Sequence, residues 1–469
     1  MSPPVASKDL KDGPQALGND DRFNSQSSFA LSGNSSQNSI QVPVSDSIIK
    51  PDSVAPRYPE YRPNDSIRSP LVIPINRRLE TLAVFGHGSS IIVLPFFYFF
   101  LWCFPIFWPF LLIYTFRFYL FDRTPSNGKG FNRYSTLIQN LGVYKHFANY
   151  YPVKLHKTVD LIPTTSQIEA RSEEFDLPWI LRILAPSMLL AVLGKIGILK
   201  KKPITIQKEI RTGPRYIFGY HPHGVIAMGA LSGFATEGAS FSHHFPGIRC
   251  FLTTLVNQFQ LPFYRDYLMS LGCTAVTKRN ISSLLNQGHS VVIVVGGATE
   301  SLLAKPGLNS IVLNRRKGFV KLALQSAGKF DESDMCLVPV YAFGENNIYD
   351  VYYTNDSQQY SKNDGYIRKL LKMFQLWLKR NVGFTLPIIA SRGLFNYDFG
   401  LLPYRRPINI VVGEPIPVYR LNGNKFGDTV TQAEVDHYHT QYVKSLGDLF
   451  EKHKKDFLAP YDHDLSIVE

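Results

Sequence analysis

The stretch "YIFGYHPHGVIAMGALSGFA", residues 216–235, decides the expected fold of this chain. Its first five residues predict a buried strand, and its last eleven predict a helix with small residues on one side. Between the two lies HPHG, in which Pro222 disfavours helical backbone for His221 and Gly224 permits close approach of a ligand. A strand that runs directly into a helix is typical of open α/β sheets, whose functional loops lie at the carboxyl ends of strands.

Other segments repeat this alternation of strand and helix. The β-branched run at 290–295 predicts a strand buried on both faces, and two glycines end it. Strands are also predicted at 336–345 and 408–418, and helices at 318–328 and 433–457. Because helices alternate with buried strands, we expect a mostly parallel sheet and hence the α/β class.

The net charge of the chain indicates what kind of molecule it binds. The chain has 469 residues, and 50 Lys and Arg against 37 Asp and Glu give a formal charge of +13. Such a balance favours nucleic acid or an anionic membrane surface, but no basic run of the nucleic-acid type occurs, so we expect no nucleic-acid partner. Four scattered cysteines form no CxxC pair, which indicates a reduced, cytosol-facing protein without a cysteine-based zinc site.

Three regions follow from changes in composition along the chain. Residues 1–68 are rich in Ser, Asn, Gln and Pro, and we expect a disordered tail. Residues 69–135 are expected to form a membrane hairpin with basic flanks, because the segment Thr81–Phe116 contains no charged residue and is interrupted by three prolines. The α/β domain is expected at 136–460 and includes an interfacial apolar segment at 177–202. A buried pair of core helices is the alternative to the hairpin.

The HPHG segment suits proton-transfer chemistry. A histidine with a pKa near neutrality can act as a base, and amides at the start of the following helix would stabilise a developing negative charge. That combination fits acyl transfer to an alcohol. Two alternatives stay open: either histidine satisfies core hydrogen bonds only, or the pair joins His243 and His244 in a metal site. The sequence has no HExxH, GxSxG or P-loop spacing, which disfavours zinc proteases, serine hydrolases and P-loop nucleotide binding.

Five blocks of the sequence, in this order along the chain, carry a resemblance to a known family: "YHPHGVIAMGALSGFATEG", "FPGIRCFLTTLVNQFQLPFYRDYLMSLG", "VVIVVGGATESLLAKPG", "NRRKGFVKLALQSAG" and "LVPVYAFGENNIYD". Together they resemble the type 2 diacylglycerol acyltransferase family, which includes monoacylglycerol and wax-alcohol acyltransferases. The resemblance implies a glycerolipid acyltransferase-like fold and an enzyme of the endoplasmic reticulum membrane and lipid droplets whose catalytic domain faces the cytosol. It implies acyl transfer from acyl-CoA to diacylglycerol, with acyl-CoA as a substrate and no cofactor.

The resemblance also implies roles for individual residues. His221 and His223 match the catalytic HPHG, and Glu237 is the candidate for orienting one histidine, because the His-x4-Asp pair of related acyltransferases is absent here. No metal is expected, and which histidine is the base stays open. The residues expected to bind substrate are Pro222, Gly224, Gly296, Gly297, Arg316, Lys317 and Gly318.

Two other functions remain open at this point. A different acceptor, monoacylglycerol or a fatty alcohol, would keep the same chemistry. A non-catalytic protein that binds lipid droplets would have no use for a positioned base. The sequence does not fix the oligomeric state.

Overall fold

The structure is a computed structural model, and it describes residues 73–175, 201–330, 334–351, 373, 389–396, 400–460 and 462–468. The predicted tail at 1–68 and most of the predicted interfacial segment at 177–202 lie outside these residues.

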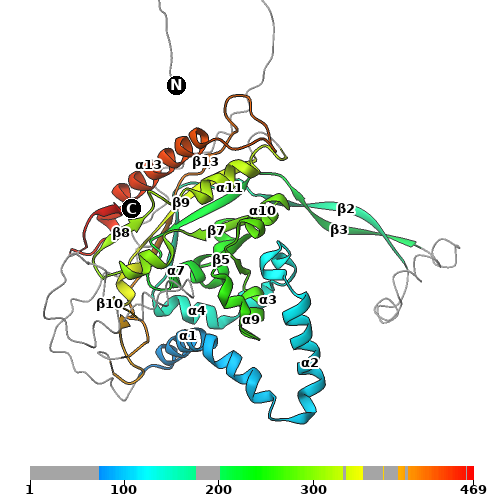
Figure 1. Cartoon of the computed structure of the whole chain (residues 1–469), viewed down its shortest axis with the longest axis vertical. Coiled ribbons are helices and arrows are strands. Elements are labelled where there is room, and N and C mark those ends of the chain that lie inside the picture. The colour runs from blue at the N-terminus through cyan, green and yellow to red at the C-terminus, as the bar shows by residue number, and fades with distance from the viewer. Residues whose placement is uncertain are drawn as a thin grey trace, which may run out of the picture. The chain divides into compact units, whose positions relative to one another are not determined.

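An eight-stranded sheet forms the centre of the molecule, with the strand order β1-β12-β9-β4-β7-β5-β6 and β13 paired to β9 (Figure 1). β4 lies in the middle and runs parallel to both β7 and β9. β5, β6 and β7 are also parallel to one another, which confirms the mostly parallel sheet. The strands are β1 Lys154–Lys157, β4 Arg215–His221, β5 Cys250–Thr254, β6 Cys273–Ala275, β7 Ser290–Val294, β9 Met335–Phe343, β12 Asn409–Val412 and β13 Ile416–Pro417.

The strand predicted at 408–418 differs from the one observed. It is divided into β12 and β13, and both run antiparallel to β9. The division falls at Gly413 and Pro415, and proline has no N–H with which to continue a ladder.

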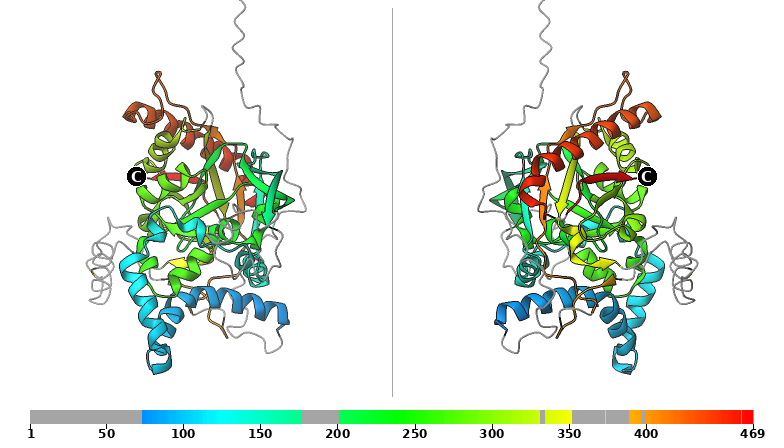
Figure 2. Two further views of the ribbon diagram at one scale, coloured as in Figure 1. Left: turned by 90° about the vertical axis from the view of Figure 1, so that its right-hand side faces the viewer. Right: turned by 90° about the vertical axis from the view of Figure 1, so that its left-hand side faces the viewer.

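Helices cover both faces of the sheet, and they form two separate cores (Figure 2). Side chains of β4 alternate between the cores: Tyr216 and Phe218 belong to one, Ile217 to the other. The first core includes residues of α4 Gly142–Tyr150 and α9 Tyr264–Ser270. The second includes residues of α10 Lys278–Asn286, α11 Gly318–Ser326 and α13 Gln432–Phe457.

The helix after β4 begins later than the sequence predicted. A turn occupies the residues after His223, and α7 Met228–Ala230 continues as a π-helix over Leu231–Ala235. Gly224 and Ala227 have φ angles of +60° and +51°, so the right-handed helix begins only after them.

The apolar segment near the N-terminus forms two helices joined by a turn. These are α1 Ile75–Leu101 and α2 Trp108–Phe116, and the rings of Tyr98 and Tyr114 contact each other across them. Pro95 lies inside α1 and does not end it, whereas the other two prolines lie in first helical turns, where no N–H is required. By length and composition, α1 is the one described helix that could cross a membrane.

The first half of α1 packs on the α/β domain. Glu80 forms an ion pair with Arg405, and His87 Nδ1 lies 2.8 Å from the Tyr267 hydroxyl on α9. Large apolar side chains in the second half, such as Phe96 and Phe99, are exposed.

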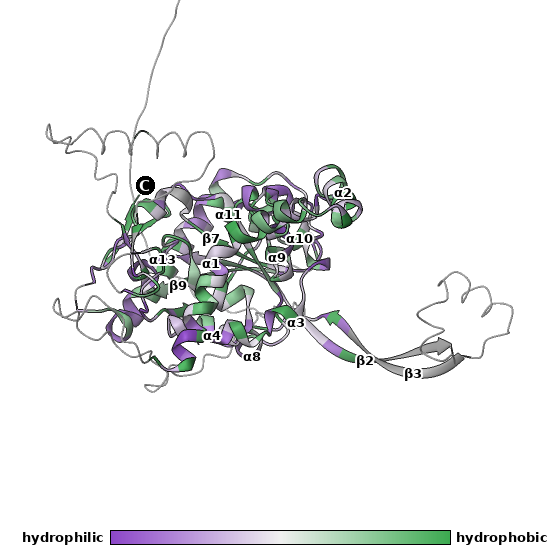
Figure 3. Ribbon diagram, turned by 90° about the horizontal axis from the view of Figure 1, so that it is seen from below, coloured by the Kyte–Doolittle hydropathy of each residue, from purple (hydrophilic) through white to green (hydrophobic). Residues whose placement is uncertain are grey.

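The remaining described elements lie outside the central sheet. β2 Thr165–Phe175 and β3 Lys201–Arg211 pair only with each other, as a long two-stranded ribbon (Figure 3). β8 Asn309–Val312 pairs with β14 Leu465–Val468 near the C-terminus. The short elements are α3 Thr136–Gln139, α8 Phe241–His244, β10 Asp350–Val351 and β11 Ile389–Ala390.

Candidate active site

The HPHG turn lies at the carboxyl end of β4, at the centre of the sheet. His221 is the last residue of the strand and is opposite Tyr341 of β9. Gly224 is required where it stands, because a Cβ there would lie 2.9 Å from Cγ of Glu345 and the residue has positive φ. Because β4 ends at His221, the prediction that the HPHG motif lies at the end of a strand is confirmed.

His221 is fully buried, and its ring contacts Tyr442 of helix α13. Its Nε2 lies 3.0 Å from the Tyr442 hydroxyl, and that hydroxyl donates to the carbonyl of Gly219 at 3.1 Å. The single hydroxyl proton is thus engaged, so Nε2 of His221 must carry the proton that lies between the two side chains. Burial lowers the pKa of His221 to about 3, so the ring is neutral.

His223 is half-buried and has the opposite tautomer. Its Nδ1 lies 3.0 Å from the carbonyl oxygen of Gly224, which can only accept, so Nδ1 is the donor. The free lone pair is then on Nε2. Burial lowers the pKa of His223, which keeps this nitrogen unprotonated near neutral pH. Of the two histidines, His223 therefore has both partial exposure and a nitrogen able to take a proton.

Glu300 supports the HPHG turn from the neighbouring strand. It lies in the 3₁₀ turn Gly297–Leu302 after β7, is fully buried, and accepts the backbone N–H of His223. Its other oxygen accepts the backbone N–H of Val312 at 2.8 Å. Burial raises its pKa to about 8. Gly296 is needed here, because a Cβ would lie 2.1 Å from Oε2 of Glu300.

Glu345 supports the turn from the other neighbouring strand. It follows β9, is fully buried, and accepts the Tyr220 hydroxyl at 2.7 Å and the N–H of Gly229 at 3.0 Å. Burial raises its pKa to about 7. The amides at the start of the helix after HPHG therefore hold this carboxylate. The expectation that they face a reacting oxyanion is wrong, because a buried side chain already occupies them.

Sequence reasoning missed both glutamates, although a signal existed. Glu300 follows the glycines that end one buried strand, and Glu345 follows the glycine that ends another. Parallel neighbours of β4 bring their carboxyl ends to the same edge, so polar residues just after such strands belong to one site.

Glu237 lies elsewhere. Its half-buried carboxylate accepts the N–H of Ser242 at 3.2 Å, and the structure does not bring it into hydrogen-bonding contact with either histidine. His244, one of the alternative metal ligands, bonds through Nδ1 to the carbonyl of Ser240 instead. Among the described residues, no group of three or more His, Cys, Asp or Glu side chains could hold a metal ion.

The residues of the RRKGF block, Arg315–Phe319, do not all lie at the site. Arg316 is brought to the site, because its guanidinium donates to the carbonyl of Gly296 at 3.1 Å. Lys317 instead forms an ion pair with Asp436 of α13 at 2.6 Å. Gly318 begins α11 and is exposed, and Gly297 has open space where a Cβ would stand. Pro222 is buried between the two histidines.

His223, a neutral histidine just past the end of a central parallel strand with its backbone held by the buried Glu300, has the properties that acid–base chemistry requires. Comparison with known proteins then places the chain. The profile of the family described as Diacylglycerol acyltransferase matches residues 99–169 and 202–468. The chain belongs to the diacylglycerol acyltransferase family. No solved structure matches it significantly.

Several curated relatives resemble the chain over most of its length. It is 44% identical to Diacylglycerol O-acyltransferase 1 of Eremothecium gossypii, over 86% of this chain and 80% of that protein. It is 40% identical to Diacylglycerol O-acyltransferase 1 of Saccharomyces cerevisiae, over 89% and 92%. The human Diacylglycerol O-acyltransferase 2 is 35% identical, over 77% and 74%.

Proposed function

We propose that this chain transfers a fatty acyl group from acyl-CoA to the free hydroxyl of diacylglycerol and so forms triacylglycerol. Membership of the family supports the pair of substrates. The observation that carries the chemistry is the contact of His223 Nδ1 with the Gly224 carbonyl oxygen at 3.0 Å, which assigns the proton to Nδ1 and leaves Nε2 as a base.

The proposed reaction uses Nε2 of His223 as the general base. His223 Nε2 takes the hydroxyl proton of diacylglycerol as the hydroxyl oxygen attacks the carbonyl carbon of the thioester. The ester C–O bond forms, the C–S bond breaks, and His223 returns the proton to the sulfur of CoA. No acyl-enzyme and no cofactor enters this balance, since acyl-CoA is itself a substrate.

The other residues position this base and its substrates. Glu300 fixes the backbone of His223, and Tyr442 fixes His221 behind it. Arg316 is the candidate for the phosphates of acyl-CoA, because it is exposed and lies beside Gly296 at the same edge of the sheet. Lys317 is a weaker candidate, because Asp436 already pairs with it.

The location of the enzyme is part of the proposal. The helices α1 and α2 would enter one leaflet as a hairpin, with both basic flanks and the catalytic domain on the cytosolic side. The exposed aromatic side chains of these helices support that arrangement. We propose the endoplasmic reticulum membrane and the surface of lipid droplets as the sites, and a glycerolipid acyltransferase-like fold for the domain.

The test uses the full chain purified in detergent, with labelled acyl-CoA and diacylglycerol, monoacylglycerol or a fatty alcohol as acceptor. We expect labelled triacylglycerol. His223→Ala should lower kcat by about 10²–10⁴-fold, which is the usual contribution of a general base. His243→Ala, an exposed histidine, is the matched control and should be unchanged. Transfer to another acceptor alone, or a normal rate in folded His223→Ala, would overturn the proposal.

A further inference from the structure

The parallel strands end at one edge of the sheet, the carboxyl edge. Three loops at this edge, beside the HPHG turn at residues 221–224 (the catalytic turn), expose apolar side chains. Together they form an apolar rim: Ile226, Leu255, Val256 and Val276, which are 50%, 36%, 37% and 41% exposed. Single exposed apolar residues need no explanation, but a group around one site marks an interaction surface.

The strand register places the rim side by side with the catalytic turn. Thr254 of β5 pairs with Ala275 of β6, and Val276 N donates to Thr254 O at 2.8 Å, so Leu255 and Val276 begin neighbouring loops. β5 is separated from β4 only by β7. Two strand spacings place the loop after β5 about 10 Å from the end of β4, and a third spacing places the loop after β6 about 14 Å away.

The loop that carries part of the rim is fixed to α1 and α2. It runs from Leu255 to Phe263, whose ring lies 6.3 Å from that of Phe97 and 5.4 Å from that of Tyr98. The backbone N–H of Phe263 donates to the Tyr114 hydroxyl at 2.8 Å. The loop that carries Leu255 and Val256 therefore ends in contact with α1 and α2, which expose many large apolar side chains.

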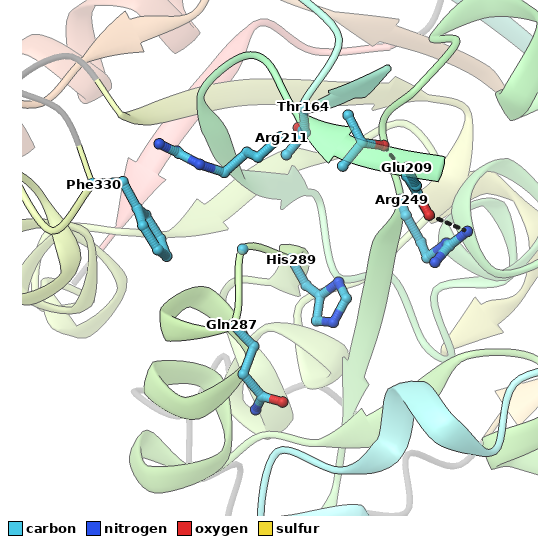
Figure 4. A pocket seen from close by; sticks show the side chains of 9 residues that line it. Thr164, Glu209, Arg211, Arg249, Gln287, His289 and Phe330 are labelled. Atoms are coloured by element: carbon cyan, nitrogen blue, oxygen red, sulfur yellow. Dashed lines mark hydrogen bonds and ion pairs between the residues drawn. The ribbon is translucent and has the colours of Figure 1, made fainter. Parts of the chain in front are cut away.

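The opposite, amino edge of the sheet has a different character (Figure 4). A cavity of about 330 Å³ opens there, and most of the residues that line it are polar or charged. Arg249 pairs with Glu209 at 3.6 Å, and the Arg211 guanidinium lies 4.1 Å from the centre of the Phe330 ring. Charged groups of this kind stay in water, so the two edges of the sheet favour different surroundings.

Basic side chains stand directly beside the rim. Lys278 and Arg279 begin α10, two and three residues after Val276, and both are exposed. An apolar surface bordered by Lys and Arg fits a lipid surface with anionic headgroups.

We propose that the apolar rim is a docking surface for the lipid bilayer and that it seats the catalytic edge of the sheet on the membrane. The inference rests on the proposed function only for its purpose, which is to hold His223 where diacylglycerol lies. The rim and the α1–α2 hairpin then form one continuous lipid-facing surface, while the amino edge faces water.

The test measures lipid contact directly and does not depend on activity. In a Cys103→Ser background, which removes the exposed cysteine, Val276→Cys is labelled with an environment-sensitive fluorophore. The full chain is reconstituted in phosphatidylcholine–phosphatidylserine vesicles containing nitroxide-labelled lipid. Phe426→Cys is the matched control, because Phe426 is 40% exposed and lies beside Gly328 at the amino edge.

We expect quenching at Val276 to exceed quenching at Phe426 by about threefold or more, since nitroxide reaches only lipid-facing probes. Equal quenching at the two positions would overturn the inference. A probe at Val276 that is already shielded in detergent and stays unquenched in vesicles would also overturn it, because a second copy of the chain would then cover the rim.

A kinetic arm separates the docking surface from the chemistry. The double variant Leu255→Ser, Val256→Ser should raise KM for diacylglycerol in vesicles by about tenfold, the order expected for two partly buried apolar side chains. Its kcat with a water-soluble short-chain diacylglycerol should match the wild type. Equal loss with both acceptors would contradict docking. Failure of the proposed function would appear differently, as wild-type protein that is quenched at the rim but makes no triacylglycerol.

Discussion

Replacing Glu300 by Gln tests whether the carboxylate beside the catalytic turn positions the base. Glu300 uses both oxygens, one for the N–H of His223 and one for the N–H of Val312. The amide of glutamine offers one acceptor, so one buried donor loses its partner. Such a loss costs about 1–3 kcal/mol, which corresponds to about 5–150-fold less of the correctly placed turn. We expect kcat to fall by about that factor, with KM for acyl-CoA nearly unchanged.

The pH dependence of activity gives this prediction a second readout. The pKa of Glu300 is raised to about 8, whereas that of His223 is lowered, so His223 is already neutral at pH 7. The wild-type kcat should therefore rise through about pH 8 as Glu300 ionises and accepts both N–H groups fully. Glu300→Gln should abolish this rise.

Stability should respond to pH with the opposite sign. Because the native pKa of Glu300 lies above its unfolded value, its contribution to stability is complete below about pH 4.5 and is lost as the pH rises through about 8. The wild-type Tm should therefore fall between about pH 4.5 and about pH 8 and level off above that pH, and the Tm of Glu300→Gln should fall less.

The assay is the initial rate of triacylglycerol formation from about pH 6 to about pH 9, which spans the pKa of Glu300. Thermal melts of the same samples report stability. Glu237→Gln is the matched control, because its half-buried carboxylate accepts the N–H of Ser242 and bonds to neither histidine, and kcat should stay within about twofold. A Glu300→Gln enzyme with a normal kcat and the same rise near pH 8 would refute the reasoning. A selective loss in Glu237→Gln would restore the role that the sequence suggested for that residue.

Three further outcomes are expected. Gly224→Ala should lower both kcat and Tm, because positive φ and a contact at 2.9 Å together cost more than about 1 kcal/mol, whereas Gly447→Ala on α13 has open space and should cost nothing. Tyr442→Phe should leave the protein folded but lower kcat, since Nε2–H of His221 loses its acceptor; an unchanged kcat would make the hydroxyl dispensable. Tags at residues 70 and 130 should both be cleaved by protease outside sealed microsomes, and protection of either tag would contradict the hairpin.

The strands and the position of HPHG could be predicted because they depend on local sequence. β7 is a β-branched run ended by glycines, and β4 is apolar up to the histidine that closes it. Burial on both faces leaves a continuous apolar run that can be recognised without knowing the neighbours. The start of the helix after β4 could not be placed, because Ala227 takes a positive φ that alanine does not ordinarily favour.

The supporting residues depended on contacts between distant parts of the chain. Glu300 lies 77 residues from His223, and Tyr442 lies 221 residues from His221. Nothing in local periodicity links such positions. Glu237 was favoured instead because the family resemblance offered it in place of the absent His-x4-Asp pair, whereas in the fold its carboxylate accepts the N–H of Ser242.

The sequence by itself therefore determined the α/β class, the position of HPHG at the end of a strand, and the family. Hydrophobic runs, turn residues and short motifs each span only a few consecutive residues, so they can be recognised in the sequence alone. The different hydrogen bonding of His221 and His223 is decided only by the tertiary structure. The two histidines flank one proline and differ only in their contacts. Packing against Tyr442 fixes a proton on Nε2 of His221, whereas the hydrogen bond from Nδ1 of His223 to Gly224 leaves Nε2 of His223 unprotonated. A tautomer depends on which partners pack around the ring, and packing exists only after the chain has folded.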